Sequence, residues 1–235
     1  MTQHRPFPVL ATVLTAAGVL TLCGLGHWQQ DRLAWKNNLQ VTMDEEFAKD
    51  AKGLLLTSDD LTKVSDSSIR RGTLQGKLDF DHQFILRGQI VDAKPASFVL
   101  IPMILPDQKT VFVVATSQAG TDKIGTPSTR AKIDKVTGTA RLSRWSSFAG
   151  QNDPEKDLWY RPDVVQMATH AKLPDPVAPL FYMESSNYKL DARPTVDIPR
   201  TLRNDHKQYM FFWYTMAGIL LVMYYLRFWR RPDAS

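Results

Sequence analysis

Two apolar runs without a formal charge decide the fold of this chain: Phe7–Gly26, FPVLATVLTAAGVLTLCGLG, and Tyr209–Leu226, YMFFWYTMAGILLVMYYL. A helix rises about 1.5 Å per residue, so each run is long enough to cross a bilayer core of about 30 Å. Two spans place both chain ends on one side of the membrane. We therefore expect transmembrane helices over residues 7–27 and 209–228, flanking one domain over residues 28–208.

Positive charge predicts the orientation of this hairpin. Arg227, Arg230 and Arg231 follow the second run, and Arg5 precedes the first. Because Lys and Arg are enriched on the cytoplasmic side of membrane spans, both termini are predicted to lie inside. The loop then faces the periplasm from a bacterial inner membrane, or the intermembrane space from a mitochondrial one.

Composition excludes several function classes. Cys23 is the only cysteine and lies in the first run, so carriers of copper or disulfides, which need paired thiols or a thiol–histidine cluster, are excluded. A cleaved or lipidated signal is the alternative for this run, but no A-x-A-like site follows and the bulky Leu22 precedes the cysteine. The net charge of +5 comes without a basic stripe interleaved with aromatics, so no nucleic-acid partner is expected.

The loop is predicted to be an α+β domain with a mainly antiparallel sheet. A helix is expected to continue from the first span to about Lys52, and a short one to begin after Pro162 and end at His170. Alternating apolar residues and turn signals predict strands over residues 69–78, 83–87, 98–104, 110–115, 135–142 and 181–184. The sequence has no G-x-S-x-G, H-E-x-x-H or P-loop motif, and no enzymatic activity is expected.

The start of the second span carries the most informative side chains. At helical spacing, one stripe contains His206, Tyr209, Met210, Trp213 and Ala217. An imidazole, two aromatic faces, a thioether and a small residue suit a flat apolar macrocycle that takes an axial ligand. An interfacial aromatic belt accounts for the same residues, and the pattern alone favours the belt.

Motifs at both membrane ends of the loop resemble a known family. They are Gly26-x-Trp28-Gln29-x-x-Arg32-x-x-Trp35-Lys36 and Asn204-x-His206-x-x-Tyr209-x-x-x-Trp213. With the order of the spans and the strand motif Val136-x-Gly138-x-x-Arg141, they are similar over most of the chain to the surfeit locus protein 1 family. One departure is Ala115–Gln118, which stands where that family usually has Asn-Arg-Gly-Trp.

The resemblance implies a non-enzymatic assembly factor for haem-copper cytochrome c oxidase. Such a factor binds haem A at the membrane–extracytoplasmic boundary and assists its insertion or retention in subunit I. Its partners are subunit I, other oxidase assembly factors and the lipid bilayer. The resemblance implies His206 as the haem-associated residue and a candidate ligand of the haem iron, and it assigns to the cofactor site Trp28, Arg32, Tyr209 and Trp213.

Position along the membrane adds a weaker hypothesis. His27 ends the first span at the predicted membrane level of His206, so it is a candidate second axial ligand, with an interfacial belt histidine as the alternative. Arg32 and Arg203 are expected to meet haem propionates there. Two other functions stay open: a cofactor-free scaffold that docks oxidase subunits or assembly factors, and a membrane-anchored sensor or chain-length regulator.

Overall fold

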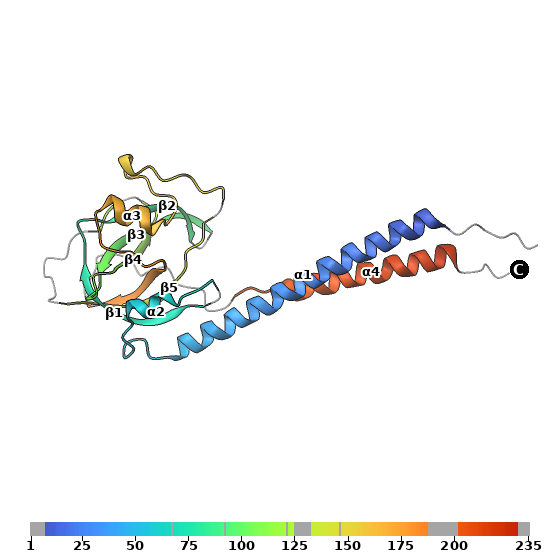
Figure 1. The fold of residues 1–235 in the computed structure, drawn as a ribbon, viewed down its shortest axis with the longest axis horizontal. Coiled ribbons are helices and arrows are strands. Elements are labelled where there is room, and N and C mark those ends of the chain that lie inside the picture. Colours follow the sequence, from blue (N-terminus) through green and yellow to red (C-terminus); the bar gives the residue numbers. More distant parts are fainter. Residues whose placement is uncertain are drawn as a thin grey trace, which may run out of the picture. The chain divides into compact units, whose positions relative to one another are not determined.

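Two long helices and a sheet domain make up the computed structural model of the chain (Figure 1). It describes residues 8–66, 68–91, 93–120, 122–124, 133–145, 147–187 and 202–229. Two compact units result: Met1–Gln40 with Thr201–Ser235, and Val41–Arg200. Residues 188–201 and the flanking arginines Arg5, Arg230 and Arg231 lie outside the described residues.

Helices α1 (Val9–Ala48) and α4 (His206–Phe228) are long and apolar enough to cross a membrane. With 40 residues, α1 measures about 60 Å, roughly twice the bilayer core. The predicted continuation of the first span as a helix is therefore confirmed. The second helix begins at His206, three residues before the expected start of the span at Tyr209, so this imidazole lies in the first turn of α4.

The two helices pack antiparallel along a seam of alternating three- and four-residue spacing. Its less exposed positions on α4 are His206, Met210, Trp213, Ala217, Leu220 and Tyr224. On α1 the less exposed positions at this spacing are Thr12, Thr15, Val19, Leu22, Gly26, Gln29, Leu33, Lys36 and Gln40, and beside them Ala11, Gly18, Cys23, Trp35 and Leu39 are half-buried as well. This repeat is typical of a coiled-coil seam.

Glycine on α1 makes room for a large side chain of α4. A Cβ atom placed on Gly26 would lie 2.8 Å from the ring of Tyr214, whereas one on Gly24 would meet nothing within 4 Å. At the far end of the pair, the Thr12 and Tyr224 hydroxyls are 2.5 Å apart. Close packing of small residues and hydrogen bonds between helices are what associate helices inside a bilayer.

The sheet unit consists of six strands and short helices. The strands are β1 (Arg70–Leu78), β2 (Phe84–Val91), β3 (Lys94–Ile104), β4 (Thr110–Gln118), β5 (Asp134–Arg141) and β6 (Leu180–Ser186). The helices are α2 (Ser58–Thr62), the 3-10 turn η1 (Pro154–Lys156) and α3 (Val164–His170). All six predicted strands and the predicted helix ending at His170 are confirmed.

Strand order is β1-β5-β6-β4-β3-β2, and a further short pairing of β1 with β3 closes five of the strands into a ring. Among the pairings between the six named strands, the predicted antiparallel arrangement holds for all except β4 with β6, which are parallel, so the sheet is mixed. The long connection between β4 and β6 permits this, because parallel neighbours need a crossover rather than a hairpin.

Alternate residues of the central strands belong to two different cores. On β3, Leu100 packs with one cluster and Ile101 with the other, and on β4 Val113 and Val114 divide in the same way. The second cluster also contains Met167 of α3 and the fully buried Trp159. Strands covered on both faces read as continuous apolar runs, which explains why β3 and β4 were predictable.

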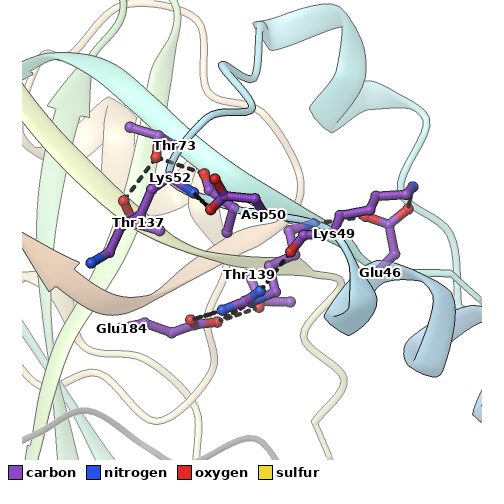
Figure 2. A network of polar contacts seen from close by, with 10 residues as sticks. Glu46, Lys49, Asp50, Lys52, Thr73, Thr137, Thr139 and Glu184 are labelled. Atoms are coloured by element: carbon purple, nitrogen blue, oxygen red, sulfur yellow. Dashed lines mark hydrogen bonds and ion pairs between the residues drawn. The ribbon is translucent and has the colours of Figure 1, made fainter.

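The C-terminal turns of α1 are fixed to the sheet by a polar network (Figure 2). Glu46, only 2% exposed, accepts hydrogen bonds from Arg70 Nη1 at 2.9 Å and from the Arg71 backbone N–H at 3.0 Å. Arg71 in turn binds both carboxylate oxygens of Glu184, with the shortest contact at 2.7 Å. The buried Glu46 carboxylate therefore joins α1 to β1, and Arg71 extends the network to β6.

Candidate functional site

The site is built around the first residue of α4. His206 Nδ1 lies 2.6 Å from Gln29 Oε1, joining residues 177 positions apart in the chain. The Gln29 side chain lies on the seam face of α1, where the residue is 8% exposed. Within the described part of the chain, no protein group hydrogen-bonds the other ring nitrogen, Nε2.

Aromatic and guanidinium groups flank this pair. The Trp28 ring meets the His206 ring edge-on, with centroids 6.5 Å apart and planes at 87°. The Arg32 guanidinium carbon stands 5.9 Å from the Trp28 ring centroid and 5.6 Å from that of Trp35. Both distances are within cation–π range, so the Arg32 guanidinium is attracted to the Trp28 and Trp35 rings next to the histidine.

A cleft of about 470 Å³ opens beside the imidazole. Its lining residues are Gln29, Lys36, Arg203, Asp205, His206, Tyr209 and Trp213. The volume falls within the range of roughly 300–1,000 Å³ that is typical of small-molecule sites. One part of the lining is aromatic and the other carries charge, so the cleft suits an amphiphilic molecule.

On the charged side of the cleft, hydrogen bonds link α1 to the residues just before α4. Lys36 Nζ donates to the backbone carbonyl of Arg203 at 2.6 Å, and Arg203 Nε lies 2.5 Å from Asp205 Oδ2. Next to them, Asn204 Nδ2 donates to Asn37 Oδ1 at 2.9 Å. The entry to α4 is therefore fixed on α1 at several successive residues.

The structure brings together some of the predicted site residues and separates others. His206, Tyr209 and Trp213 line one cleft, and Trp28 packs on the imidazole. Arg32 and His27 are not among the lining residues. His27 Nε2 instead lies 3.9 Å from Asp31 Oδ2 with its side chain 72% exposed, so its role as a second axial ligand stays a prediction.

Gln29 and Lys36 belong to the motif that follows the first apolar run, but the sequence alone assigned neither of them a role. Both lie seven residues apart on the seam of α1, whereas Trp28 and Arg32 lie beside it. The signal was present as the heptad spacing Leu22, Gly26, Gln29, Leu33, Lys36. Polar residues that continue an apolar seam must find polar partners on the facing helix.

Comparison with known proteins agrees with the two end motifs. The model of the SURF1 family matches residues 16–218, which is most of the chain. The chain belongs to the SURF1 family. Relatives include surfeit locus protein 1 of Rattus norvegicus, 25% identical over 90% of this chain and 73% of the relative, and that of Homo sapiens, 24% identical over 90% and 75%. A SURF1-like protein of Dictyostelium discoideum is 24% identical over 86% of this chain and 90% of its own length.

The structure explains the glycine of the strand motif Val136-x-Gly138-x-x-Arg141. A Cβ atom on Gly138 would lie 2.1 Å from the backbone oxygen of Tyr182, so only glycine lets β5 and β6 approach there. Ala115–Gln118, the stretch expected to depart from the family, form the end of β4. Ser97 and Phe98 of β3 pair with the last two residues of this stretch, so the departure leaves the strand intact.

Proposed function

We propose that this SURF1-family chain is a non-catalytic assembly factor for haem-copper cytochrome c oxidase that holds haem A in the cleft beside His206. Its proposed task is the insertion or retention of haem A in subunit I. The partners are then subunit I and other oxidase assembly factors. The resemblance of both membrane-end motifs to the family supports this assignment.

The observation that carries the proposal is the pairing of His206 with Gln29 at one wall of the cleft. Imidazole is a common protein ligand of haem iron, so His206 would hold the group through its ring. The lining matches the rest of the molecule: Tyr209 and Trp213 offer apolar aromatic faces, and Lys36 and Arg203 offer cations for carboxylates. The residues present therefore fit the group.

We also propose the membrane orientation that the sequence predicts. The apolar parts of α1 and α4 span a bacterial or mitochondrial inner membrane, with both termini inside and the sheet unit extracytoplasmic. In this arrangement the start of α4 lies at the membrane boundary, where an amphiphilic molecule can keep its apolar part in lipid. Reporter fusions to either terminus and to the sheet unit test the orientation.

The decisive experiment is purification in detergent after co-expression with haem A synthesis. The wild-type protein is expected to carry a Soret band, and His206→Ala to lose most of it. Lys207→Ala, at the exposed neighbouring position, is the matched control and should retain the haem. Equal haem content in wild type and His206→Ala would overturn the assignment of this residue.

A cofactor-free docking scaffold is the second candidate, and one observation favours it. In the segment after β5, Phe148 is 98% exposed and Trp145 48% exposed. Aromatic side chains are enriched at protein–protein interfaces. A wild-type protein that co-purifies with oxidase subunits, carries no Soret band and loses those subunits when both aromatics are replaced by Ser would favour the scaffold.

A further inference from the structure

We infer that Gln29 is a positioning residue for His206: it holds the neutral imidazole in the tautomer protonated at Nδ1. The lone pair of Nε2 is then available to a transition-metal centre, such as haem iron. This inference rests on the proposed function for the identity of the metal. The tautomer itself follows from the contact between the two side chains.

The contact dictates which nitrogen carries the proton. An amide carbonyl oxygen has no proton to donate, so the 2.6 Å approach of Gln29 Oε1 to His206 Nδ1 is a hydrogen bond only when Nδ1 donates. A neutral imidazole has a single N–H, so Nε2 is then the acceptor. With the Gln29 amide oxygen facing Nδ1, the opposite tautomer would place two lone pairs against each other.

Gln29 is itself held where it can impose this choice. It is 8% exposed and lies on the seam between Gly26 and Leu33, so its side chain has little room to turn away. The Trp28 ring, edge-on to the imidazole, limits rotation of His206. The hydrogen bond is partly buried, and a lower local dielectric strengthens it relative to one at the surface.

The arrangement is the one that metal-binding histidines usually have. Such a histidine donates its second N–H to a carbonyl or carboxylate, which fixes the ring orientation and raises the basicity of the ligating nitrogen. Loss of that partner typically lowers metal affinity by roughly 10- to 100-fold. Gln29 supplies the acceptor here, and the apolar part of the cleft lies beside the same ring.

The tautomer can be measured without any haem. The full-length protein is labelled with ¹⁵N-histidine, placed in detergent micelles at about pH 8, where an ordinary imidazole is neutral, and studied by NMR. The chain has five histidines, and the His206 signals are identified by their loss in His206→Ala. Protonated and unprotonated ring nitrogens have well separated shifts, so each tautomer is read directly.

Matched variants separate positioning from packing. Gln29→Met keeps the approximate size and removes the acceptor, so His206 should become a mixture of both tautomers. Gln29→Glu keeps an acceptor oxygen and should keep the Nδ1–H form. Gln30→Met, at the exposed neighbouring position, should behave as wild type. Gln29→Leu repeats the test with another shape if Gln29→Met does not fold.

Loading with haem A gives the second arm. We expect the dissociation constant to rise roughly 10- to 100-fold in Gln29→Met and to stay near the wild-type value in Gln30→Met. A wild-type His206 protonated at Nε2, or an unchanged Nδ1–H form in Gln29→Met, overturns the inference. If the tautomers behave as expected and the wild type does not bind haem A, the haem assignment fails while the tautomer assignment stands.

Discussion

Glu46 and Arg70 form an ion pair of 2.9 Å in which the carboxylate is almost fully buried and the guanidinium is not. Glu46 belongs to the last turns of α1, and Arg70 begins β1. Lys49 Nζ adds a third donor, 2.6 Å from the same oxygen. One buried carboxylate thus fixes the end of the long helix to the first strand of the sheet.

Replacement of this carboxylate should destabilise the sheet unit. Glu46→Ala leaves the Arg71 N–H and two cations without their acceptor, and we expect a loss of about 2–4 kcal/mol in the free energy of unfolding. For a unit of this size, that lowers Tm by roughly 5–10 °C, measurable by circular dichroism of the full chain in detergent. Glu45→Ala, at an exposed position of the same helix, should change Tm by less than about 2 °C.

The same residue predicts a pH dependence. Burial alone would raise the pKa of Glu46, but hydrogen bonds from Lys49 and Arg71, with the charges of Lys49 and Arg70, hold the pKa below its ordinary value. The unfolded chain therefore binds a proton at higher pH than the folded chain, and stability rises with pH across that window. The Tm advantage of wild type over Glu46→Gln should be full above about pH 4.5 and shrink as the pH falls below it. A pH-independent difference would contradict this reading.

Gly138 should tolerate no side chain. Its Cβ would lie 2.1 Å from a backbone oxygen, which cannot move aside as a flexible side chain can. Gly138→Ala is expected to destabilise the sheet unit by about 1–3 kcal/mol through forced separation of β5 and β6. In Gly120→Ala the nearest atom would be 3.6 Å away, so this variant is the control, and equal Tm values in both would disprove the steric argument.

Gly26 and Gly24 offer a matched test of the helix pair. Gly26→Leu would push into the Tyr214 ring, while Gly24→Leu has open space. We expect only Gly26→Leu to loosen the packing of α1 against α4. Cysteines at Thr12 and Tyr224, in a Cys23→Ala background, report this as a lower yield of intramolecular bismaleimide cross-linking. Comparable yields in the two leucine variants would show that the close approach is not needed.

The lining of the cleft predicts which positively charged side chain binds a carboxylate of the ligand. Lys36 lines the cleft and Arg32 does not. Lys36→Met should weaken haem A binding by roughly tenfold, the typical size of one charge-assisted hydrogen bond. Arg32→Met should retain near-wild-type affinity in the same titration, although it removes an equal charge four residues away. The reverse order would favour the earlier expectation that Arg32 meets the propionates.

Much of the local structure could be predicted because its physical cause is local. Charge-free runs longer than a bilayer core must be helical in lipid, where every backbone group needs an internal partner. Continuous apolar stretches such as those of β3 and β4 indicated buried strands. Helix α2 was missed, although its capping box is a local signal: Thr57 and Asp60 bond each other's backbone N–H.

By itself, the sequence determined the two long apolar helices, the strands and the motif that contains His206. Only the tertiary structure decided what these elements meet: the parallel pairing of β4 with β6, the Gln29 acceptor on His206, and Lys36 rather than Arg32 in the cleft. The physical reason is the separation along the chain over which each interaction acts. Periodicity reports which face of an element is buried, whereas a hydrogen bond between residues 177 positions apart depends on how two elements are brought together and in which register.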